Sequence, residues 1–139
     1  MVGKKGVRDV RNIYLETRGK GATVGGVADI GKRGLSDIRE VVGIVFSILK
    51  DYAFGTTRDH SGHQIQMTYR LASQRLRFLK DTVLPRDSDF RGSKLRRAKH
   101  VVSEGLRILK RYKGKRARLA SDLLKILRRL ERVAERSRA

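Results

Sequence analysis

Apolar side chains recur at alternating spacings of three and four residues through most of this sequence. One such series consists of Ile65, Tyr69, Ala72, Leu76, Leu79 and Val83. Two later series consist of Leu95, Ala98, Val102, Gly105, Leu109 and Tyr112, and of Ala120, Leu123, Leu127, Leu130 and Ala134. This spacing places apolar side chains on one face of an α-helix, where they pack against another helix. No strictly alternating segment of useful length indicates a sheet.

Turn and capping signals divide these series into helices. Ser36 and Ser93 are placed to cap helices, whereas Pro85 and Gly114 are placed to end them. Gly55 to Gly62 is expected to form a turn. Helices are therefore predicted over about 35–54, 63–85, 93–114 and 116–136. The predicted fold class is all-α, a bundle of about four helices arranged as two hairpins.

Two apolar surfaces leave alternatives open. The segment from Val41 to Leu49 is apolar all round, so it belongs either at the centre of the bundle or in a contact between subunits. It is far shorter than the roughly 20 residues needed to span a bilayer. Met67, Leu71 and Phe78 form a second stripe on the helix that follows the turn. This stripe serves either core packing or contact with another subunit.

Residues 1–34 differ from the rest and are predicted to form a basic, Gly-rich N-terminal arm, with the bundle occupying 35–139. The arm contains eight glycines, and Val7, Val10 and Tyr14 suggest a short helix within it. Glycine costs a helix up to about 1 kcal/mol per residue, so an isolated arm is expected to fray. The glycines either allow close approach to a phosphate backbone or a neighbouring helix, or mark a flexible linker.

The strongest compositional feature is charge, because 34 Lys and Arg stand against 14 Asp and Glu and give a net charge of +20. Solubility alone requires a net charge of about 2 to 8 in a small domain. Duplex DNA carries roughly two phosphates per base pair, so this excess could cover on the order of 10 bp. We therefore expect stoichiometric binding to a polyanion, first of all a nucleic acid, with an anionic membrane surface or an acidic protein as the alternatives.

Half of the excess lies between Lys94 and Arg118, where eleven basic residues stand against the single acid Glu104. One line of this helix, opposite the apolar series, holds Arg96, His100, Ser103, Arg107 and Arg111. The last helix is expected to turn Arg118, Lys125, Arg128, Arg132 and Arg136 outward. The predicted DNA-binding residues are Lys4, Lys5, Arg8, Arg11, Arg18, Lys20, Lys32, Arg33, Arg70, Arg77, Lys94, Arg96, Arg97, Lys99, Arg107, Lys110, Arg111, Lys113, Lys115, Arg116 and Arg118.

These contacts are expected to be independent of base sequence. Base-reading side chains are scarce, with one Asn and three Gln, and most of the four Phe and four Tyr lie on apolar series. Backbone and shape recognition therefore remain. The low amide content also fits a thermophilic source.

No catalytic, metal or cofactor site is predicted, and the chain is not expected to be an enzyme. Asp59, His60 and His63 resemble a ligand set, but no third His or Cys is nearby, so capping or phosphate contact is favoured. Asp87 and Asp89 are interpreted as a loop with a helix-start signal. A phosphate-cradling Gly-rich motif followed by Lys and Ser or Thr is absent from the sequence.

In architecture the whole chain resembles the major coat proteins of filamentous archaeal viruses that package double-stranded DNA. The resemblance consists of the basic arm from Lys4 to Gly34, the apolar-seamed helical hairpins, the lack of cysteine and the unmatched positive charge. It implies a virion nucleocapsid protein that wraps DNA in the A form. It also implies assembly with itself or a homologous coat protein, and contact with a surrounding membrane envelope.

Two other functions remain open at this stage. The first is a cellular chromatin-like or ribosome-associated protein of the cytoplasm or nucleoid that binds DNA or structured RNA without forming a filament. The second is a protein-interaction or membrane-surface module that uses the helix from Leu35 to Phe54.

Overall fold

The computed structural model describes residues 36–136, so the predicted arm lies outside the described residues. The long helices are α3 (Ser36–Phe54), α4 (Tyr69–Phe78), α6 (Gly92–Arg111) and α7 (Arg116–Arg136). A π-helical segment, η2 (Leu79–Val83), and the short helix α5 (Leu84–Arg86) extend α4, and a hairpin of β1 (Thr56–Arg58) and β2 (Gln64–Gln66) precedes it. The described chain is thus a helical bundle, as the sequence predicts, with one small two-stranded sheet that was not predicted.

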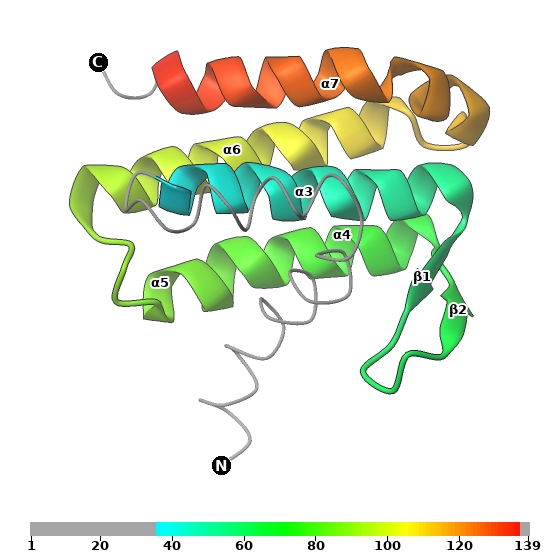
Figure 1. Ribbon diagram of the computed structural model, residues 1–139, viewed down its shortest axis with the longest axis horizontal. Coiled ribbons are helices and arrows are strands. Elements are labelled where there is room, and N and C mark those ends of the chain that lie inside the picture. The colour runs from blue at the N-terminus through cyan, green and yellow to red at the C-terminus, as the bar shows by residue number, and fades with distance from the viewer. Residues whose placement is uncertain (1–35, 137–139) are drawn as a thin grey trace.

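Helix α3 lies at the centre of the bundle and contacts α4, α6 and α7. Helices α7 and α4 lie on opposite sides of a layer that α3 and α6 form (Figure 1). Every residue from Val41 to Leu49 is buried. The helix that is apolar all round therefore occupies the bundle centre, which resolves the alternative that the sequence leaves open.

The apolar series on α6 faces the core as predicted, whereas on α7 Leu119 and Ile126 are buried in place of the predicted Ala120 and Leu127, which are half-buried. Ala98, Val102 and Leu109 are fully buried on α6, and Leu123, Leu130 and Ala134 are buried on α7. Gly105 belongs to the α6 series because α6 passes close to α3 there. A Cβ atom at this position would collide with Cγ1 of Val45. The small residue thus sets the distance between the two central helices.

The expected turn is instead a β-hairpin, and the helix after it begins later than predicted. Ile65, the first member of its apolar series, lies in β2 and pairs with Thr57 of β1. The helix starts at Tyr69, where the Thr68 hydroxyl accepts a hydrogen bond from the Leu71 backbone N–H at 3.0 Å. Three-residue strands are too short to produce a visible alternation, so the periodicity of the sequence could not reveal them.

The end of this helix also differs from the prediction. Pro85 does not terminate it, because the chain continues through η2 and α5 to Arg86. Proline lacks an N–H and its ring crowds the preceding turn of a regular helix. The wider π-turn accommodates it, and the Leu84 N–H bonds to the Leu79 carbonyl, five residues back.

In this region of the chain the structure resolves one alternative and contradicts one expectation. Met67 is fully buried, and Leu71 and Phe78 pack partly buried against the core, so the second stripe serves core packing. Ser93 does not cap α6, because Arg91 occupies the cap position and Gly92 has a positive φ of 57°. Gly114, with a φ of 76°, follows the end of α6 as predicted.

The close approach at Gly105 makes a stability prediction. We expect Gly105→Ala to lower the free energy of unfolding by about 1 to 3 kcal/mol, because the added methyl group overpacks the α3–α6 contact. Adding Val45→Ala should recover part of the loss by making room for that methyl group. Urea denaturation of the three variants measures both effects. Strictly additive losses would contradict the proposed clash.

Candidate nucleic-acid interface

Helices α6 and α7 form a hairpin whose alignment is fixed at two places. Near the turn, the Tyr112 hydroxyl donates to Asp122 Oδ2 at 2.6 Å. This hydrogen bond, together with burial, raises the pKa of Tyr112 above its ordinary value. Further along, Glu104 of α6 pairs with Arg129 of α7, with Oε2 and Nη2 2.7 Å apart. The two contacts set which residues of the two helices lie opposite one another.

Glu104 is the single acidic residue in the most basic stretch of the chain, and its carboxylate is paired within the fold. Its side chain is only 5% exposed and contacts two guanidinium groups, those of Arg129 and Arg107. An unpaired carboxylate at such a depth would be strongly destabilising. The pairing therefore neutralises the buried charge and leaves the surrounding surface basic.

The exposed cations of the two helices adjoin one another. Taking 100° per residue, the predicted line on α6 lies about 20–100° around the helix from Glu104, on the outer side. Four cations on α7 lie similarly about 20–60° to the outer side of Arg129. Together they form what we call the α6–α7 basic surface, which comprises Arg96, Arg107 and Arg111 with Arg118, Lys125, Arg132 and Arg136, all exposed, and includes the exposed His100 on the same line.

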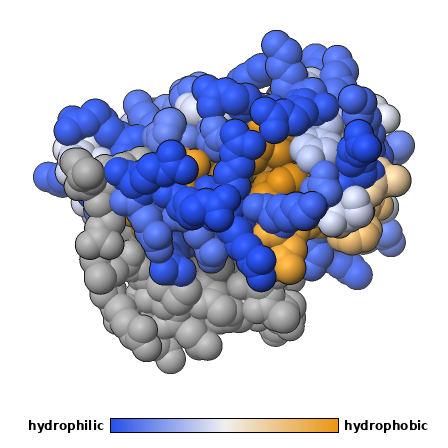
Figure 2. Space-filling model, turned by 90° about the horizontal axis from the view of Figure 1, so that it is seen from above, coloured by the Kyte–Doolittle hydropathy of each residue, from blue (hydrophilic) through white to orange (hydrophobic). Residues whose placement is uncertain are grey.

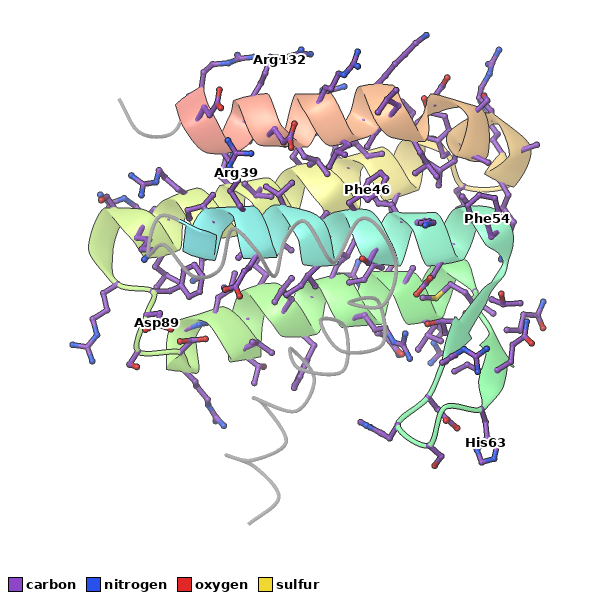
Figure 3. The ribbon with its side chains drawn as sticks, viewed as in Figure 1. Arg39, Phe46, Phe54, His63, Asp89 and Arg132 are labelled. Atoms are coloured by element: carbon purple, nitrogen blue, oxygen red, sulfur yellow. The ribbon has the colours of Figure 1, made fainter. Side chains whose placement is uncertain are left out.

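The views of the molecule agree with this arrangement. Figure 2 looks onto the side of the bundle formed by α7 and shows a largely hydrophilic face that is interrupted by apolar surface. Figure 3 shows Arg132 projecting from α7 away from the bundle. A polyanion could therefore approach these side chains without contacting the core.

Acidic side chains on α7 are kept away from this surface. Asp122 is bonded to Tyr112, whereas Glu131 and Glu135 lie on the other flank of the helix, toward α3. There both carboxylates are 3.8 Å from the guanidinium group of Arg39. On α7 most of the exposed cations thus lie on one flank and Glu131 and Glu135 on the other, with Arg128 between the two groups.

Arg116 is predicted from the sequence to contact DNA, but the structure gives its guanidinium another role. It donates to the backbone carbonyls of Tyr52 at 3.0 Å and Met67 at 2.6 Å, and it stacks 4.4 Å from the centre of the Tyr52 ring. The side chain joins α7 to the end of α3 and to the segment after β2. Arg116 is therefore a structural residue at the base of the hairpin.

The other residues that were predicted to contact DNA lie on different parts of the molecule. Arg70 and Arg77 are exposed on α4, across the bundle from α7. Arg97 is half-buried and faces α7, and Lys113 and Lys94 lie over the rings of Tyr69 and Phe90. Lys110 and Lys115 are exposed and Lys99 is half-buried. Outside the described residues lie Lys4, Lys5, Arg8, Arg11, Arg18, Lys20, Lys32 and Arg33.

The hairpin of β1 and β2 carries exposed polar side chains that were not among the predicted DNA-binding residues. Its register places Arg58 beside Gln64 and Thr56 beside Gln66, all exposed. No periodic signal marks this face, because the strands are short. The pairing of Arg129 with Glu104 was also not predicted, because nothing in the sequence indicates that the two residues lie opposite each other.

The histidine-containing turn of this hairpin is built as a structural turn. Asp59 Oδ1 accepts hydrogen bonds from the backbone N–H groups of Ser61 and His63. The bond from His63 is the main reason that the pKa of Asp59 is held below its ordinary value. Over residues 36–136, no cluster of three or more His, Cys, Asp or Glu side chains could hold a metal ion.

Comparison with known proteins found no matching family model, no similar curated protein and no similar solved structure. Among the described helices, none combines the length and the apolar character needed to cross a membrane.

The different placements of Arg116 and Arg118 make a paired prediction. We expect Arg116→Ala to lower the free energy of unfolding by about 1 to 3 kcal/mol, because two carbonyls lose a charged donor. Arg118→Ala, on the exposed side of the same helix, should change stability by less than about 0.5 kcal/mol. Thermal or urea denaturation of both variants measures the difference. Equal losses would contradict the structural role of Arg116.

Proposed function

We propose that this protein coats nucleic acid, binding double-stranded DNA through its phosphates without sequence preference. The observation that carries the proposal is the α6–α7 basic surface, which collects exposed cations from two aligned helices. The neighbouring carboxylates of Glu104 and Asp122 are paired within the fold, and Glu131 lies on the other flank of α7. Such a surface matches a phosphate backbone and offers little for base readout.

The size of the charge favours coating over recognition of a short site. Residues 36–136 contain 25 basic and 11 acidic side chains, a net charge of +14. The α6 row from Arg96 to Arg111 extends about 22 Å at 1.5 Å per residue. A duplex of that length carries about 13 phosphates at one charge per 1.7 Å. One molecule therefore brings about enough charge to neutralise the duplex beside it.

The most specific form of the proposal is a viral coat protein. The resemblance in architecture to coat proteins of filamentous archaeal viruses favours packaging of DNA in a virion. Partners of this chain would then be duplex DNA, further copies of itself or a homologous coat protein, and a surrounding envelope. A chromatin-like or ribosome-associated protein is the alternative.

The salt dependence of binding tests the basic surface. We expect replacement of Arg111 and Arg132 by Gln to reduce the slope of log K against log salt by about 2, at roughly 0.9 per lost phosphate contact. The loss should be the same on duplexes of unrelated sequence, because phosphates carry no sequence information. Fluorescence anisotropy over a salt series measures both quantities.

A matched pair of exposed arginines on α4 provides the control. Arg70→Gln with Arg77→Gln removes the same charge from the opposite side of the bundle, and the slope should change much less. An equal change in the control pair would show that only net charge matters, which would remove the assigned surface. Tighter binding to a folded RNA than to duplex DNA at matched salt would favour the cellular alternative.

A further inference from the structure

The hairpin of β1 and β2 projects beyond the helices at the end of the bundle where α3 ends and α7 begins (Figure 1). Its strands pair antiparallel, with Thr56 opposite Gln66 and Arg58 opposite Gln64. Because side chains alternate between the two faces of a strand, these four residues share one face. All four are exposed, whereas Thr57 on the other face is buried. The hairpin therefore presents a polar face to solvent.

Contacts of the opposite face and of the turn fix the position of this polar face. The Thr57 hydroxyl donates a hydrogen bond to Asp51 of α3 at 2.8 Å and accepts one from Arg75 of α4 at 3.1 Å. In the turn, Asp59 Oδ1 accepts hydrogen bonds from two backbone N–H groups. The polar face is thus held on a rigid support, which a recognition surface requires.

The composition of the polar face differs from that of an ordinary solvated surface in this chain. The sequence contains three Gln, and two of them, Gln64 and Gln66, lie side by side on β2. Solvation alone does not require amides, because charged residues make up 35% of the chain and serve that purpose elsewhere. The carboxylate of Asp59 is bonded to the turn, so the face itself contains hydrogen-bonding side chains and a cation but no acid.

These side chains suit the base edges of a DNA duplex. Gln forms paired hydrogen bonds with adenine and Arg with guanine in the major groove, which is about 12 Å wide and admits a two-stranded β-ribbon. Three strand residues extend about 10 Å, slightly more than the groove depth of about 8.5 Å. Gln64 and Gln66 lie about 7 Å apart along their strand, which matches two base steps of about 3.4 Å each.

The base of the hairpin adjoins one end of the α6–α7 basic surface. Arg116 at the start of α7 donates to the carbonyls of Tyr52 and Met67, which lie on either side of the hairpin in the chain. Arg111 and Arg118 of the basic surface lie within five residues of Arg116. A duplex held at this end of the basic surface therefore lies next to the hairpin.

We propose that the hairpin enters the major groove of duplex DNA bound at the basic surface, where Gln64 and Gln66 contact base edges. The groove contact rests on the proposed function and adds bases to the phosphates that the basic surface contacts. It requires that the bound duplex keep the B form, because the major groove of an A-form duplex is too narrow for side chains to read. In this respect it differs from the A-form DNA that the resemblance to coat proteins implies.

Binding to duplex DNA and duplex RNA of one sequence, with adenine at every second position, tests the groove contact. We expect Gln64→Ala with Gln66→Ala to weaken binding to the DNA roughly fivefold or more. The slope of log K against log salt should stay unchanged, because amides neutralise no phosphates. Binding to the RNA should also stay unchanged, since its major groove is closed to side chains. This arm also shows that the variant is folded.

The third glutamine provides the matched control. Gln74→Ala removes an exposed amide from α4 and should leave both affinities unchanged. Equal losses on DNA and RNA, an equal loss with Gln74→Ala, or no loss on either duplex would overturn the groove contact. Circular dichroism of the wild-type complex supplies a second readout. Retention of the B-form spectrum is expected, and conversion to the A form would overturn the groove contact.

Salt series on the same samples separate the groove contact from the proposed function. If replacement of Arg111 and Arg132 by Gln lowers the slope while the Gln64 and Gln66 variant binds like the wild type, only the groove contact is refuted. If those arginines leave the slope unchanged while the loss on DNA alone persists, only the proposed phosphate-binding surface is refuted.

Discussion

The structure depends on complete burial of the apolar centre of α3. Val41 to Leu49 present no polar face, so other helices must surround this segment to remove it from water. Helices α4, α6 and α7 do so, and Gly105 lets α6 approach closely enough to pack against Val45. Once these helices enclose α3, their remaining faces become the outer surface of the protein. The positions of the cations follow from that arrangement.

The same core limits where charged side chains can lie in the fold. A charge inside an aliphatic core is tolerated only when it is paired. Asp51 accepts a hydrogen bond from Thr57, and Glu104 pairs with Arg107 and Arg129. Among the described residues, the three acids Asp51, Asp87 and Glu104 are buried, while most of the cations stay on the surface. The folded chain is left with an excess of outward positive charge, which a polyanion would relieve.

Helix α7 separates two kinds of surface. Its flank beside α6 is basic, and its flank beside α3 is apolar with acids at one end. In the proposed function the first flank contacts phosphates. The second flank shares none of its side chains with that contact.

The sequence by itself determined the helical class, the bounds of α7 and the buried face of α6, because a 3.6-residue period is a local property. Only the tertiary structure decided the hairpin of β1 and β2, the continuation past Pro85 and the inward turn of Arg116. It also decided that Met67 is buried and Leu124 exposed. These outcomes depend on which distant segments become neighbours, such as Tyr52 beside Arg116, and periodicity along one helix carries no information about them.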